Sequence, residues 1–254
     1  TPADVAADIG PGLAQSAIGA RLDGTLVDLN EPIDGDAALS IVTARKGESE
    51  SSDDALWLIR HSAAHVMAEA IQRIWPEVKL VYGPPVEGGF YYDMWLPDDC
   101  KISSDDFEKI EKEMASIIEE NRPFSRYEMN AEEGLAKLQG EGSKYKIDNA
   151  ERAIEAGSQE LTWYATGKPG GNWEDLCRGP HVPTTGRIGA FKVMSIASSY
   201  WHGDAKSDRL TRVYGTAFTD RKQLKKHLKR LEEARKRDHR VIGKQLGLFT
   251  IDDA

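Results

Sequence analysis

The sequence contains very little cysteine: Cys100 and Cys177 are its only two among 254 residues. An exported protein stabilised by disulfides normally carries more, so this scarcity favours a reducing cytoplasm. The chain also lacks any apolar run near the roughly 18 residues of a membrane span. Its first residues, TPADVAADIGPG, have neither the basic stretch nor the apolar core of an export signal. These absences predict a soluble, cytoplasmic globular protein that does not associate with membranes.

Positive charge is scarce over most of the chain, since the formal net charge is −9 at pH 7. This excludes a protein that grips nucleic acid with its whole surface. The exception is the stretch from Arg221 to Lys244, where eleven basic and three acidic residues give +8 and leave −17 for the remainder. Two interpretations stay open for this stretch: a solvated helix face, or a surface that contacts a phosphate backbone.

Residues 1–46 predict a small unit with a short helix, a hairpin that turns at Asp23-Gly24, and a strand over 39–44. So small a unit buries little apolar surface, so the chain is expected to start partway into a domain. The polar segment 46–54 is expected to be a linker. The boundaries that follow are 1–46 for the first domain, 47–219 for the second, and 220–254 for a terminal linker helix.

The second region has an α+β pattern. Apolar residues at helical spacing predict a helix from Leu56 to Ile74, capped by Asp53 or Asp54 and ended by Trp75-Pro76. Further helices are expected at 105–121, 131–138 and 220–246, and strands at 78–83, 89–96, 124–129, 161–166, 191–196 and 210–218. The last helix has little core of its own to pack against.

Two short motifs, HSAAH from His61 to His65 and CRGPH from Cys177 to His181, carry the strongest chemical signal. Histidines four residues apart on a helix share one face, and a second Cys/His pair completes four ligands suited to zinc. A metal is not required by this pattern. The same groups can line a dry pocket in which imidazoles orient water and relay protons.

A hydrolytic site also needs a cation or hydrogen-bond donors that face the developing oxyanion, and Lys144 or Lys146 in GSKYKID can supply a cation. Asp175 can hold an ammonium group or orient a histidine. The segment GPPVEGGFYYDMW offers glycines for close backbone approach and aromatics that can stack on an adenine, although strand alternation predicts that half of these rings are core. Taken alone, the pattern favours an exposed surface position for each of these charged residues.

The motifs RHSAAH, GPPVEGGFYYD, SKYKI, WEDLCRGPHVPTTG, SSYWHGD, RVYGTAF and EEARKRDHRVIGKQLGLF together resemble the editing region of bacterial-type threonyl-tRNA synthetases. DIGPGLA and LSIVTA resemble the small β-grasp domain, called TGS, that precedes that region. The resemblance covers nearly the whole chain. It implies an α+β architecture: a truncated TGS domain, a larger editing domain related to that of alanyl-tRNA synthetases, and a linker helix toward a class II catalytic core.

The resemblance also implies a division of labour. Threonine–tRNA ligation, with its ATP, Mg and Zn, and homodimerisation are expected to belong to a core beyond Ala254. The chain itself is expected to act as an aminoacyl-tRNA deacylase that binds tRNA(Thr) and hydrolyses seryl-tRNA(Thr), with no cofactor. By motif, the implied catalytic residues are His61, Lys146 and Asp175. The implied substrate-binding residues are His65, Tyr92, Cys177 and His181. No metal is expected in this chain, and the ligands for one would be His61, His65, Cys177 and His181.

Two other functions fit the same residues. One is an alanyl-type deacylase that depends on zinc bound by His61, His65, Cys177 and His181. The other is a noncatalytic RNA-binding or regulatory module that contacts tRNA or the ribosome through the basic helix. Metal analysis and a deacylation assay distinguish these from metal-free editing.

Overall fold

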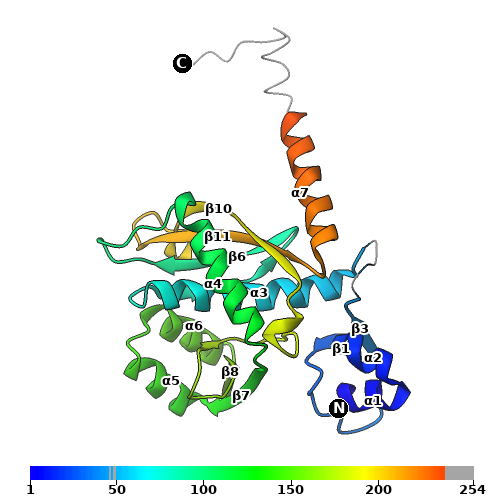
Figure 1. Ribbon diagram of the computed structural model, residues 1–254. Coiled ribbons are helices and arrows are strands. Elements are labelled where there is room, and N and C mark those ends of the chain that lie inside the picture. The colour runs from blue at the N-terminus through cyan, green and yellow to red at the C-terminus, as the bar shows by residue number, and fades with distance from the viewer. Residues whose placement is uncertain (46, 48–49, 238–254) are drawn as a thin grey trace.

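The chain folds into an α+β structure in which a small amino-terminal unit lies beside a larger body (Figure 1). The computed structural model describes residues 1–45, 47 and 50–237. A long helix, α7 (Arg221–Lys236), projects away from the body (Figure 1). Within the described ranges, every helix is too short or too polar to cross a bilayer.

The amino-terminal unit has two helices, α1 (Pro2–Ile9) and α2 (Pro11–Ser16), packed on a three-stranded sheet. Its strands β1 (Ala17–Leu22), β2 (Thr25–Val27) and β3 (Leu39–Thr43) are antiparallel in the order β2-β1-β3. The predicted turn is present: Asp23 and Gly24 both have positive φ, as a two-residue hairpin requires.

The larger body is organised around an antiparallel sheet in the order β10-β11-β6-β4, with β5 paired to β6. Its strands are β4 (Lys79–Tyr82), β5 (Pro85–Val86), β6 (Gly89–Trp95), β10 (Ala190–Tyr200) and β11 (Arg209–Phe218). Helix α3 (Asp53–Ile74) packs against β6 and β11, and α4 (Phe107–Glu119) packs on α3. Because α3 has neighbours on both sides, most of its residues are buried, including His61 and His65.

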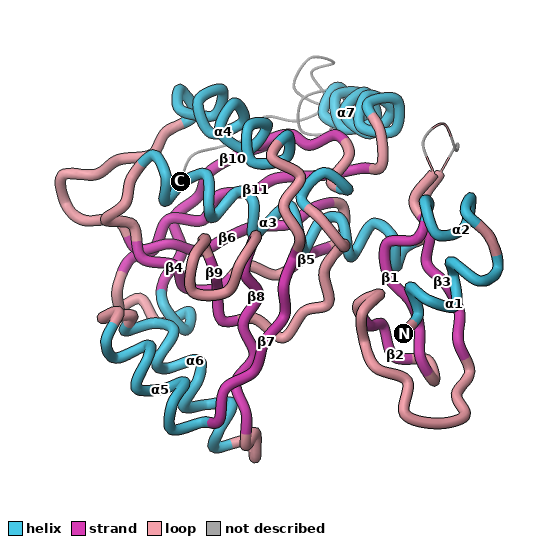
Figure 2. Tube along the Cα trace, turned by 60° about the horizontal axis from the view of Figure 1, so that its bottom comes forward, coloured by secondary structure: helices cyan, strands magenta, loops and turns pink. Residues whose placement is uncertain are grey.

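A second, three-stranded sheet in the order β7-β8-β9 lies below the first (Figures 1 and 2). Its strands are β7 (Phe124–Asn130), β8 (Glu160–Thr166) and β9 (Glu174–Leu176), covered by helices α5 (Ala131–Gly140) and α6 (Lys144–Glu155). Trp163 of β8 forms a small separate core with Leu138 and Ala150. The short helical turns η1 (Ser104–Asp106), η2 (Thr185–Arg187) and η3 (Trp201–Gly203) complete the described elements.

Three local predictions need correction. Ser52, rather than Asp53 or Asp54, caps α3, because its side chain accepts the amide of Ala55. The segment around Lys146 forms α6, which was not expected. Helix α7 contacts β10 and β11, where Gln223 is buried, so its first turns do have a core to pack against. The predicted continuation of α7 to 246 lies outside the described residues.

Candidate functional site

A cleft of about 590 Å³ opens between the two sheets, and six of the seven predicted site residues line it. They are His61, His65, Tyr92, Lys146, Asp175 and Cys177. The seventh, His181, lies directly behind the wall, with its ring stacked 4.2 Å from that of His61. Residues from α3, β6, α6, β9 and the following loop therefore meet at one place, although they are up to 120 positions apart (His61 to His181).

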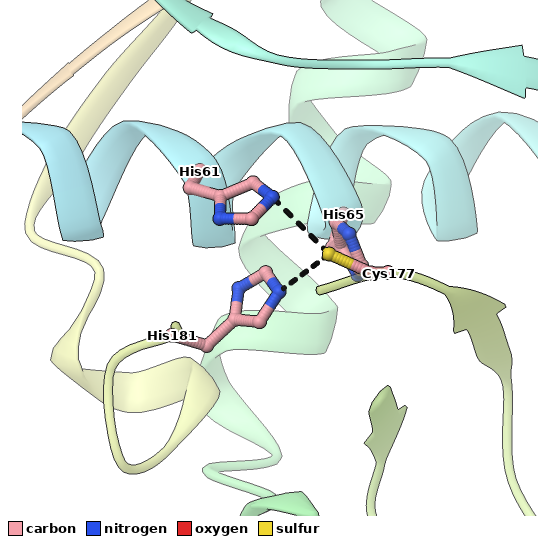
Figure 3. A group of neighbouring side chains, drawn as sticks. All are labelled: His61, His65, Cys177 and His181. Carbon is pink, nitrogen blue, oxygen red and sulfur yellow. Dashed lines mark hydrogen bonds between the residues drawn. The ribbon is translucent and has the colours of Figure 1, made fainter. Parts of the chain in front are cut away.

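The His/Cys cluster is formed by α3 and by the loop from Cys177 to His181 (Figure 3). His61 and His65 project from one face of α3, as the four-residue spacing predicts, with ring centroids 5.4 Å apart. The Cys177 Sγ lies 3.3 Å from His61 Nε2 and 3.5 Å from His181 Nε2. The two motifs therefore form one cluster.

Hydrogen bonds determine where the protons of this cluster lie. The Nδ1 of His61 is 3.1 Å from the carbonyl oxygen of Pro180, which can only accept, so Nδ1 carries the proton and Nε2 keeps its lone pair. Burial lowers the pKa of His61 to about 4 and that of His65 to about 3. Burial also raises the pKa of the Cys177 thiol to about 12. At neutral pH the cluster is therefore uncharged, and Cys177 can donate to His61.

The donor set of this cluster also fits zinc. Zn–N distances of about 2.0 Å and Zn–S of about 2.3 Å place tetrahedral ligands about 3.5 Å apart, close to both Cys–His distances. The four ligand atoms lie within 4.8 Å of one another, so closing the set requires a small movement. Among the described residues, His65 Nδ1 is buried without a hydrogen-bond partner, which leaves one ring nitrogen available as a ligand.

A second group, formed by Lys146, Asp175 and Tyr92, borders the same cleft. The Nζ of Lys146 lies 2.6 Å from Asp175 Oδ1 and donates to the Tyr92 hydroxyl at 2.9 Å, and that hydroxyl donates to Asp175 Oδ2. Burial alone would raise the pKa of Asp175, but the Lys146 charge and these hydrogen bonds hold it below its usual value. Burial and the neighbouring carboxylate raise the pKa of Tyr92 well above its usual range.

The structure distinguishes the two lysines between which the sequence left a choice. Lys146 is only 5% exposed and faces the cleft. Lys144, two residues earlier on α6, has a side chain that is 59% exposed and pairs with Asp208. Two of the three Nζ donors of Lys146 serve Asp175 and Tyr92 within the described part of the chain, so the third can face a ligand in the cleft.

The mouth of the cleft contains residues that the sequence did not single out. Tyr82 is 55% exposed there, beside Arg152 and Arg178, whose side chains are also exposed. In the segment after Tyr82, Phe90 is core, as strand alternation predicts for half of these rings, and Arg212 covers the Tyr91 ring at 3.9 Å. Arg178 is part of the CRGPH motif, and this position in the sequence could have indicated that it lies at the cleft.

Two family models match the chain. One, described as "Threonyl and Alanyl tRNA synthetase second additional domain", matches residues 167–214, and the other, described as "TGS domain", matches residues 1–43. The first includes Asp175, Cys177 and His181. The second covers the amino-terminal unit.

Similar proteins span the whole chain. The threonine–tRNA ligase of Erythrobacter litoralis is 45% identical over 258 residues, which cover 100% of this chain and 37% of the relative. The threonine–tRNA ligase of Anaeromyxobacter dehalogenans is 46% identical over 249 residues, which cover 98% of this chain and 36% of the relative. That of Halalkalibacterium halodurans is 45% identical over 253 residues, which cover 99% of this chain and 37% of the relative. The chain thus spans little more than a third of these relatives. Both domain models and this identity show that it belongs to the threonine–tRNA ligase family.

Proposed function

We propose that this chain is an aminoacyl-tRNA deacylase that hydrolyses seryl-tRNA(Thr). One observation carries the proposal: the buried group of Lys146, Asp175 and Tyr92 borders the same cleft as His61, whose Nε2 is unprotonated. Threonine–tRNA ligation with ATP, Mg and Zn, and dimerisation, then belong to the portion of the longer relatives that this chain does not span. The proposed boundaries are 1–46, 47–219 and 220–254.

The need for such an activity follows from the similarity of the two amino acids. A site that recognises threonine through its hydroxyl also accepts serine, which lacks only a methyl group worth roughly 1–3 kcal/mol. A second pocket that admits serine and excludes the threonine methyl corrects the resulting errors. A cleft bounded by buried, closely packed side chains suits this steric exclusion.

The residues divide the work by their chemistry. The Lys146 ammonium polarises the ester carbonyl and stabilises the oxyanion that forms when water adds to it. Asp175 attracts the ammonium group of the seryl moiety. His61 accepts the ribose hydroxyl next to the ester at Nε2, where that hydroxyl takes the place of the Cys177 thiol as donor. A pKa of about 4 makes His61 a hydrogen-bond acceptor rather than an acid at neutral pH.

The remaining residues shape and support the pocket. Tyr92 is 1% exposed and fixes the Asp175 carboxylate through its hydroxyl. His65 and Cys177 line the wall of the cleft beside His61, and His181 packs behind that wall. Hydrolysis of the ester releases serine and leaves the ribose hydroxyl of the terminal adenosine.

The direct test is deacylation of seryl-tRNA(Thr) and threonyl-tRNA(Thr) by this chain. Seryl-tRNA is expected to be hydrolysed faster by more than about 200-fold, because steric exclusion of the larger side chain is not limited to the free energy of one buried methyl group. Equal rates for the two substrates would contradict the proposed serine pocket, and no hydrolysis of either would favour a noncatalytic RNA-binding module.

A second candidate, a zinc-dependent deacylase of the alanyl type, is favoured by the four clustered ligands and by His65 Nδ1, which has no hydrogen-bond partner in the described part of the chain. In that case His61, His65, Cys177 and His181 would hold the ion, which would supply a Lewis acid or an activated water. The candidate is placed second because Lys146, 2.6 Å from Asp175, already supplies a cation beside the cleft.

Removing metal is expected to leave seryl-tRNA hydrolysis unchanged, because the Lys146–Asp175 pair already provides a cation beside the cleft. The measurement is the deacylation rate after dialysis against a strong chelator, together with the zinc content of the protein. Loss of activity that stoichiometric zinc restores would establish the second candidate instead.

Substitutions in α7 test whether this helix binds the tRNA. Lys225, Lys226 and Lys229 are exposed there. Lys226 pairs with the exposed Glu50 at 3.1 Å and Lys229 with the exposed Glu233 at 4.0 Å, and such ion pairs have little energetic value. Replacing all three lysines by glutamine is expected to weaken seryl- and threonyl-tRNA binding equally. The slope of log affinity against log salt should fall by roughly 0.9 for each duplex phosphate that the variant no longer neutralises. Unchanged affinity and slope would show that these charges only solvate the helix.

A further inference from the structure

A carboxylate of the amino-terminal unit reaches the site in the larger body. Asp28 follows β2, and its Oδ1 accepts the backbone N–H of His181 at 2.8 Å. Its Oδ2 accepts the hydroxyl of Tyr164, a residue of β8. One side chain thus joins the first unit to two segments of the second, 153 and 136 positions away.

The loop that Asp28 holds is the one that carries Cys177 and His181. The Tyr164 hydroxyl lies directly beneath it, since a Cβ on Gly179 would come within 2.0 Å of that oxygen. The His181 ring packs on the Tyr164 ring at 4.5 Å and is stacked on Phe124 at 4.9 Å. Asp28 therefore fixes both the loop backbone and the aromatic ring on which the loop rests.

Other interactions keep Asp28 in this position. Arg187 of the larger body donates to the carbonyl oxygen of Ala17 at 2.8 Å, and Arg21 forms a double hydrogen bond with Asp54. Gly19 lies against Leu58 of α3, where a Cβ would meet a side-chain carbon at 2.5 Å. Because the unit is attached at several points, the carboxylate needs little reorganisation to hold the loop.

We propose that Asp28 is a positioning residue of the deacylase site, so that the amino-terminal unit forms part of that site. The inference rests on the proposed function. Asp28 acts through the His181 backbone, which sets where the His181 ring and the Cys177 thiol lie relative to His61. Loss of the carboxylate leaves the N–H of His181 without its acceptor and lets the loop move.

The test compares Asp28→Ala with Asp28→Asn and with Asp23→Ala. Asparagine keeps an oxygen that can accept the His181 N–H, so it is the conservative variant. Asp23 is the matched control because its carboxylate accepts a backbone N–H, that of Ala38 at 2.8 Å, within the same unit and away from the cleft. Each variant is assayed for kcat and KM with seryl-tRNA(Thr).

A second readout does not depend on catalysis. Cys177 is alkylated with iodoacetamide, and its labelling rate is measured by mass spectrometry relative to Cys100, the other thiol, which serves as an internal reference. Asp28→Ala is expected to lower kcat by on the order of tenfold to a hundredfold, with little change in KM, and to speed labelling of Cys177. Asp28→Asn should largely restore both, and Asp23→Ala should change neither.

Unchanged kcat and unchanged Cys177 labelling in Asp28→Ala would overturn the inference. An equal loss of kcat in Asp23→Ala would also overturn it, because stability of the unit, rather than the Asp28 carboxylate, would then control the site. If the unsubstituted chain hydrolyses no seryl-tRNA, the proposed function fails, and the labelling rate still decides whether Asp28 positions the loop.

Discussion

Replacing Lys146 by methionine is expected to lower kcat for seryl-tRNA deacylation by on the order of 10²–10³-fold, the usual effect of removing one group that stabilises an oxyanion. Methionine keeps an apolar stem in the buried position while deleting the charge. The matched control is Lys144→Met, two residues earlier on α6, where the side chain is 59% exposed. It should retain the full rate in the same single-turnover assay.

The same change also affects stability, because Asp175 loses the cation 2.6 Å away and is left as a buried charge. Breaking one partner of such a pair costs about 3–5 kcal/mol. Urea titration therefore has to show that the variant is folded under the conditions of the kinetic assay. A folded Lys146→Met protein that keeps full turnover would remove Lys146 from the proposed mechanism.

Local pattern was sufficient to predict most of the framework. Helix α3 has apolar residues at helical spacing, so its extent and the shared face of His61 and His65 followed directly. The hairpin turn at Asp23-Gly24 was equally local. Motif resemblance brought together the seven site residues, and the structure places six of them around the cleft and His181 behind its wall.

What could not be predicted depends on partners distant in the sequence. Helix α6 has few apolar residues, so its sequence, KYKIDNAERAIE, resembles a solvated segment. Lys146 is buried only because Asp175, 29 positions later, compensates its charge. Asp28 has no local feature that marks it, and its role depends on a backbone N–H 153 positions away. Spacing rules contain no information about such pairs.

The buried histidines lead to a second prediction, that the free energy of unfolding depends strongly on pH. In the unfolded chain, His61 and His65 take a proton near the ordinary pKa of 6.5, whereas in the folded chain burial lowers the pKa to about 4 and about 3. Between these values the unfolded state binds more protons, so the free energy of unfolding falls as the pH falls below 6.5. His181, whose pKa burial also lowers well below 6.5, acts in the same direction.

At pH 5 the loss from His61 and His65 amounts to roughly 2 kcal/mol each, or about 4 kcal/mol together, a large part of the 5–15 kcal/mol typical of a domain. Urea unfolding between pH 7.5 and pH 5, with chelator present, measures it. His65→Leu should flatten this dependence, whereas the control variant His202→Gln, at an exposed position on η3, should not. A free energy of unfolding that stays constant across this range would mean that the three rings are protonated as readily in the folded chain as in the unfolded chain. The cluster would then not be uncharged at these pH values, and His61 could not act as the proposed hydrogen-bond acceptor.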